Sequence, residues 1–108
     1  MKADELKEVL NLHEEWLKCN EIGERANLEG ADLRWADLRG ADLRGALNYY
    51  SFFAYDTSKR IVHCVKHDDT WMIQAGCFWG ILEELEKKVK DTHNSKVYLA
   101  NIEILKTL

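Results

Sequence analysis

The chain has 108 residues, of which 46% are apolar and 31% charged, the size and composition of one folded domain rather than of a disordered tail. Its formal net charge of −4 offers no basic surface for phosphate neutralisation, which excludes duplex DNA as an expected partner. No stretch approaches the ~18 consecutive apolar residues of a membrane span, and charged residues follow Met1 almost directly. We therefore expect a protein that neither spans a membrane nor is secreted.

The three cysteines are Cys19, Cys64 and Cys77, too few and too scattered for a disulfide framework. Their odd number leaves at least one thiol free, which fits a reducing compartment. This pattern predicts a cytoplasmic protein.

The segment from Asp4 to about Cys19 has the spacing of an amphipathic helix. Asp4 is available to cap its first turn, and we expect Trp16 to anchor a core. The apolar residues recur at steps of three and four: Leu6, Val9, Leu10, His13, Trp16 and Leu17. Residues 1–22 are therefore expected to form a capping helix.

From Ala26 the period of the sequence changes to five residues. The chain runs Ala-Asn-Leu-Glu-Gly, then Ala-Asp-Leu-Arg-Trp, then Ala-Asp-Leu-Arg-Gly twice, and a fifth unit fails at Leu47. Neither a helix nor a strand has this period, so the pattern indicates an internal repeat. Its leucines must share one kind of environment: Leu28, Leu33, Leu38 and Leu43.

These units resemble the pentapeptide-repeat family, whose pattern is Ala-(Asp/Asn)-Leu followed by two variable positions. The resemblance implies a right-handed quadrilateral parallel β-helix, in which each unit forms one side. It places the four leucines inside with Ala26, Ala31, Ala36 and Ala41, and it turns outward the arginines with Asn27, Asp32, Asp37 and Asp42. Four units make only about one coil over residues 23–47. A repeat structure normally needs about three or more stacked repeats for stability. Another part of the chain, or a second copy, must cover it.

Residues 48–108 are expected to form a β-hairpin and two helices. Strong β propensity marks a strand from Tyr49 to Tyr55, and two further strands follow at 61–65 and 71–75. A helical stripe begins near Ile81 and extends to about Lys90, and a last apolar segment from 97 to 108 predicts a second helix. The expected fold class is α+β.

The repeat arginines Arg34, Arg39 and Arg44 occupy the same position of successive units. Each follows an acidic residue by two positions, so one interpretation is a solvated face whose charges cancel. The other is recognition of an anion, because guanidinium groups bind phosphate or carboxylate in a bidentate manner. One coil would direct these arginines to different sides.

The aromatic residues Trp71, Phe78 and Trp79 lie close together in sequence. Such a cluster usually belongs to a core, but exposed faces beside Lys66 and the repeat arginines would suit a nucleobase and its phosphate. The candidate ligand-binding residues are therefore Arg34, Arg39, Arg44, Lys66, Trp71 and Trp79.

Metal binding and catalysis have weaker patterns. Cys64 and His67 have the spacing C-x-x-H, with Cys77 further on, but no clear fourth zinc ligand follows. A cysteine-histidine enzyme would use Cys77 with His63 or His67, yet no spacing supplies an orienting group or an oxyanion site. We expect no metal, no cofactor and no enzymatic activity.

The overall layout also resembles small proteins encoded by phages and prophages. It predicts an accessory protein of the bacterial cytoplasm that binds stoichiometrically, either sequestering a small anion such as a nucleotide signal or blocking a host defence protein. The alternative is an assembly module whose repeat coil serves homo-oligomerisation. A homodimer or higher even oligomer is expected in either case, with its contact at Tyr49, Tyr50, Phe52 and Phe53.

Overall fold

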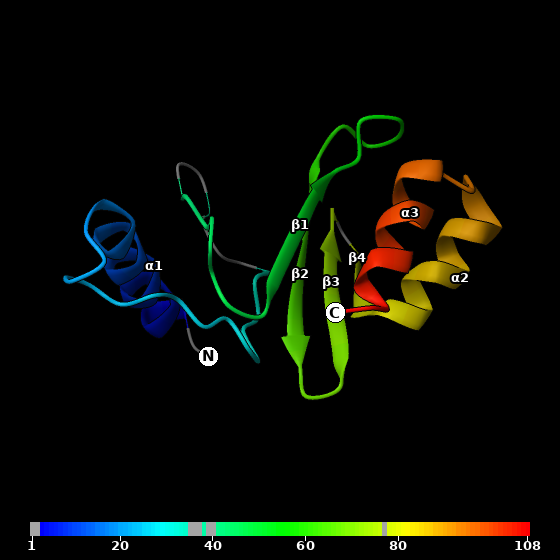
Figure 1. Ribbon diagram of the computed structural model, residues 1–108. Helices are drawn as coiled ribbons and strands as arrows, with labels where there is room; N and C mark the ends of the chain where they lie inside the picture. The colour runs from blue at the N-terminus through cyan, green and yellow to red at the C-terminus, as the bar shows by residue number, and fades with distance from the viewer. Residues whose placement is uncertain (1–2, 35–37, 39–40, 77) are drawn as a thin grey trace.

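A computed structural model of the chain describes residues 3–34, 38, 41–76 and 78–108 (Figure 1). The elements in chain order are α1 (Ala3–Lys18), β1 (Tyr49–Phe53), β2 (Ile61–His67), β3 (Thr70–Ala75), β4 (Phe78–Ile81), α2 (Leu82–Thr92) and α3 (Lys96–Leu105). The repeat segment, residues 26–47, connects α1 to β1. The chain thus has an α+β fold, and among the described residues no helix has both the length and the apolar character that a membrane crossing requires.

The strands form one antiparallel sheet in the order β1-β2-β3-β4. The three expected strands are confirmed, and the turn between β2 and β3 has Asp68 at a positive φ of 53°. The expected hairpin is present as β2 and β3, and Phe78–Ile81 adds a fourth strand opposite β3 that was not predicted. This run is four residues long, too short for its period to distinguish a strand from the entry to a helix.

The two C-terminal helices confirm the sequence-based expectation. Leu82, Leu85 and Val89 form the buried stripe of α2. Ser95 caps α3, because its hydroxyl accepts a bond from the Tyr98 N–H at 3.2 Å and donates to Asp56 at 2.7 Å. Both helices pack on the same face of the sheet.

The sheet is the middle layer between two cores. On one face, Val62, Cys64 and Ile73 pack with α2 and α3. On the other, Val65 packs with Leu6 of α1 and with the leucines of the first two repeats. Figure 1 shows this order, with the helical pair on one side of the sheet and the repeat segment followed by α1 on the other.

The interior of the repeat segment is closed only in its first half. Leu28 and Leu33 are fully buried together with Ala26 and Ala31, as the repeat pattern predicts. Leu38 and Leu43 are only half-buried and Ala41 is exposed, so the expectation of four equivalent interior units was wrong for these residues. Ala36, Asp37 and Arg39 lie outside the described residues.

The described part of the repeat segment contains one isolated parallel bridge, between Asn27 and Leu47, rather than strands of a β-helix. The Leu28 N–H donates to the Leu47 carbonyl at 3.0 Å, and the Leu47 N–H donates to the Ala26 carbonyl at 2.8 Å. A parallel ladder between coils requires a second coil, and here only the first and last units can meet. The extended sheet of the protein is accordingly the antiparallel one.

His13 of α1 holds the two ends of the repeat segment together. Its Nδ1 accepts a bond from the Ala26 N–H at 2.9 Å, and its Nε2 donates to the Arg44 carbonyl at 2.9 Å. The side chain is completely buried and stacks on Trp16. Because a backbone N–H can only donate and a carbonyl can only accept, this geometry defines the neutral tautomer with its proton on Nε2.

His13→Phe tests this clamp. The ring keeps its volume but leaves the buried Ala26 N–H and the part-buried Arg44 carbonyl without this partner, so we expect the free energy of unfolding to fall by about 3 kcal/mol. Urea denaturation would measure the loss. The control His93→Phe removes a single acceptor, the one for the part-buried Ser95 N–H, at an exposed position, and it should cost about 1 kcal/mol or less. Equal losses in the two variants would contradict the clamp.

Candidate functional site

The candidate site is an open groove of about 590 Å³ between the repeat segment and the sheet. The repeat segment provides one wall with Leu38, Ala41, Leu43 and Arg44, and strands β1 and β2 provide the other with Tyr49, Tyr50, Ser51, Ile61 and His63. The groove thus exposes the half-buried leucines of the last two repeats.

Strand β2 explains why the groove opens at one end. Its repeat-facing side chains are successively less covered: Val65 is fully buried, His63 is half-buried and Ile61 is 55% exposed. Phe53, opposite Ile61 on β1, is also 52% exposed. The repeat segment and the hairpin therefore form a wedge that is closed near Val65 and open near Ile61.

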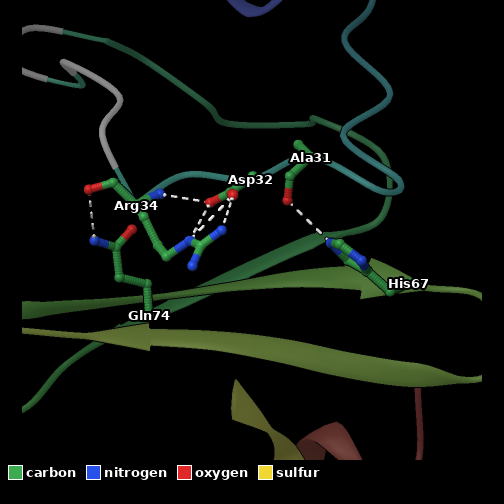
Figure 2. A network of polar contacts seen from close by, with 5 residues as sticks. All are labelled: Ala31, Asp32, Arg34, His67 and Gln74. Carbon is green, nitrogen blue, oxygen red and sulfur yellow. Dashed lines mark hydrogen bonds and ion pairs between the residues drawn. The ribbon is translucent and has the colours of Figure 1, made fainter. Parts of the chain in front are cut away.

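A polar network closes the other end of this wedge (Figure 2). His67 Nε2 donates to the Ala31 carbonyl at 3.0 Å. Gln74 Nε2 donates to the Arg34 carbonyl at 3.4 Å. The Arg34 guanidinium also lies over the Trp79 ring, 5.3 Å from its centroid. These contacts connect the first two repeats to β2, β3 and β4, so they support the groove rather than line it.

The polar pair inside the groove is neutral near pH 7. The Tyr49 hydroxyl and His63 Nδ1 are 2.5 Å apart. Burial raises the pKa of Tyr49 and lowers the pKa of His63, because desolvation disfavours both charged forms. The phenol and the neutral imidazole therefore share this hydrogen bond, and the other polar side chains of the wall are Ser51 and Arg44.

Two of the repeat arginines are paired with the acidic residues of their own units. Arg44 and Asp42 form a bidentate pair with a shortest distance of 2.5 Å, and Arg34 and Asp32 form the same pair at 2.6 Å. Hydrogen bonds from the guanidinium groups lower the pKa of both carboxylates, since they stabilise the charged form. The solvated-face interpretation therefore describes these two arginines, while Arg39 lies outside the described residues.

The candidate ligand-binding residues do not meet at one place. Arg34 and Trp79 lie together on the repeat-facing side of the sheet. Lys66 lies over Trp71, 5.1 Å from the ring centroid, and Trp71 belongs to the core beneath α2 and α3. Arg44 lines the groove. The described candidate residues therefore do not form one nucleotide site.

The four predicted contact aromatics divide between the two faces of β1. Tyr49 is a wall of the groove, and Phe53 is exposed beside it. Tyr50 points to α3, where its hydroxyl bonds Asn101, and Phe52 is buried edge-on against Tyr98. Ile61 was not among the candidate residues and His63 was considered only as a partner of Cys77, although their period-two spacing with Val65 marks one face of a strand.

The cysteine and histidine of the C-x-x-H pattern lie on opposite faces of β2. Cys64 is buried beneath the helical pair, where burial raises the pKa of its thiol, whereas His67 faces the repeat segment. They cannot bind one metal ion together. Among the described residues, which do not include Cys77, no group of three His, Cys, Asp or Glu side chains could hold a metal.

Comparison with known families identifies the repeat segment. Residues 24–46 match the family model described as pentapeptide repeats (8 copies). No curated protein and no solved structure matches the chain. The match covers the segment that forms one wall of the groove.

The lowered pKa of His63 predicts a dependence of stability on pH. The unfolded chain binds a proton at this residue near the ordinary pKa of 6.5, before the folded chain does. The free energy of unfolding should therefore fall as the pH decreases below that value. His63→Gln, which retains an acceptor for Tyr49, should lose less stability between about pH 7.5 and pH 5.5 than the parent in urea titrations. A parental pH dependence that persists unchanged in His63→Gln would assign the effect to another group.

Proposed function

We propose that this chain is a non-enzymatic binding protein that acts stoichiometrically, and that its groove receives apolar side chains from an extended segment of a protein. The observation that carries this proposal is the half-open interior of the repeat segment. Leu38 and Leu43 pack only partly against the core and also line a cavity of about 590 Å³, and the opposite wall adds Ile61 and Tyr49. Ligand sites of proteins have volumes of about 300–1,000 Å³ and mainly apolar walls with few polar groups.

The character of the walls favours a protein segment over a small anion. Arg44 is the cation of the groove wall, and Asp42 already occupies its guanidinium in a bidentate pair. A phosphate would have to displace that carboxylate, and it would gain little from the neutral Tyr49–His63 pair. Arg34 is paired in the same way and covers Trp79, which leaves less of that ring for a nucleobase. An excess absorbance near 260 nm in purified protein would reverse this preference.

We also propose that the repeat segment is one coil of a right-handed quadrilateral β-helix. Its support is the bridge between Asn27 and Leu47, because these residues are four units apart and four sides complete one coil. The resemblance of the layout to small phage and prophage proteins makes a host protein, including a defence protein, the partner of choice in a bacterial cytoplasm. An assembly role for the same surface is the second candidate, supported by the exposed Phe53 beside the groove.

Selection from a displayed library of random linear peptides tests the binding function. Enriched peptides should carry aliphatic or aromatic residues at alternate positions, because an extended segment presents every second side chain to one wall. Ile61→Glu should weaken binding of these peptides about tenfold or more, since it places a charge in the apolar wall. The matched control is Ile104→Glu, a similarly exposed isoleucine on α3, which should bind as the parent does.

Two results would contradict the proposal. One is a selection without enrichment of apolar peptides, and the other is equal loss of binding in the two glutamate variants. Heteronuclear NMR of the parent with an enriched peptide adds an independent measurement, because the amide shifts should concentrate in β1, β2 and residues 41–44.

A further inference from the structure

Strand β1 is an edge of the sheet, and its backbone polarity can be assigned residue by residue. The Lys66 N–H donates to the Asn48 carbonyl and the Ala54 N–H donates to the Arg60 carbonyl, both at 3.0 Å. Since hydrogen-bonded pairs alternate in an antiparallel ladder, Tyr50 and Phe52 bond β2. The backbone groups of Tyr49, Ser51 and Phe53 consequently point away from β2. Among the described residues, none accepts a bond from the Ser51 or Phe53 N–H.

The side chains of the same three residues face the groove side of the sheet. Tyr49 and Ser51 line the groove, and Phe53 lies beyond its open end with 52% of its surface exposed. Ile61, which is opposite Phe53 in the sheet, extends this apolar surface and is 55% exposed. One edge of the molecule thus has a strand ready to pair, a protruding aromatic ring and an apolar groove that could receive such a ring. An isologous dimer requires this combination, because the same patch must serve as both partners.

We propose that a second copy of this chain occupies the groove. The two β1 strands pair in antiparallel fashion about Ser51, and Phe53 of each copy enters the groove of the other. This inference rests on the proposed function in one respect, namely that the groove receives apolar side chains.

The symmetry of the strand selects the register. β1 has five residues, Tyr49–Phe53, and Ser51 is its centre. A two-fold axis at Ser51 aligns the outward backbone groups of both copies and places Phe53 of one opposite Tyr49 of the other. Side chains of directly opposed residues are about 4.5–5.5 Å apart at Cβ and lie on the same face. Tyr49 lines the groove, so this register places the Phe53 ring of the second copy beside the groove wall.

The contact is small enough to be reversible. A whole aromatic side chain buries about 150–250 Å², so Phe53, which is 52% exposed, offers roughly 100 Å² per copy. A standard interface takes about 800 Å² per partner, and the strand edge and groove walls must add the remainder. We expect a monomer–dimer equilibrium in the micromolar range. The dimer covers the groove until a competing protein segment displaces the second copy.

Sedimentation velocity across a concentration series tests the dimer and its surface together. Ser51→Pro removes an N–H that points away from β2, and proline is tolerated at such edge positions, so the fold should persist while dimerisation weakens about tenfold or more. Ser51→Ala keeps the N–H and should dimerise as the parent does. Phe53→Asp should also weaken the dimer, whereas the exposed control Ile104→Asp should not. Circular dichroism verifies that each variant is folded.

Cysteine cross-linking tests the register. In Ser51→Cys the two thiols occupy a hydrogen-bonded pair with Cα atoms about 5.5 Å apart, within reach of a disulfide or a short bismaleimide. In Phe53→Cys they are four residues out of register, about 13 Å apart, and a disulfide should not form. The parent chain, with its exposed Cys19, measures the background under the same oxidation. Peptide mapping should locate the link at position 51.

The outcomes separate this inference from the binding function. A parent that remains monomeric at high micromolar concentration overturns the dimer, as does a dimer that Ser51→Pro and Phe53→Asp leave unchanged. Either result leaves the peptide selection above unaffected. Conversely, a Ser51-centred dimer without any enrichment of apolar peptides would retain this interface and reject the binding of other proteins.

Discussion

A short run of pentapeptide repeats cannot bury its own interior, and the rest of the structure follows from this constraint. In a long array the stacked repeats cover one another, but the repeats of this chain match the family model only over residues 24–46. The chain covers the first half with α1 and with Val65 of the sheet, which together bury Leu28 and Leu33. His13 completes the closure with polar bonds, because it satisfies backbone groups at Ala26 and Arg44 that a larger array would pair in ladders.

One face of the sheet covers the repeat segment, and the other face packs against the two C-terminal helices. Its helix-facing residues, such as Val62 and Ile73, form a core with α2 and α3 that includes none of the described repeat residues. The repeat-facing side is buried only as far as the coil reaches, and burial decreases from Val65 to Ile61. The groove is the region where two curved elements of different length diverge. Its apolar character is inherited from residues that would be interior in a longer array, namely Leu38 and Leu43.

The sequence predicts the elements of this protein better than their contacts. The period of five locates the repeat segment, and the helical stripes locate α1, α2 and α3, because both signals are local. Strand β4 escaped detection, since four residues carry too little periodicity. The groove could not be predicted, because Leu43 and Ile61 meet only through tertiary packing. The same holds for His13. Its position on an apolar stripe indicates burial, but it does not indicate that the ring bonds the Ala26 N–H and the Arg44 carbonyl.

The repeat arginines that the structure describes pair with acidic residues of the same repeats. Arg34 and Arg44 follow their aspartates by two residues, and this spacing allows each guanidinium to return to its own unit as a bidentate pair. Such exposed pairs contribute little stability, but they neutralise the outer face of the coil. Under the proposed function, recognition on this side of the molecule comes from the apolar wall and the edge of β1 rather than from charge. Such a surface would suit extended chain segments, which supply both a strand and alternating side chains.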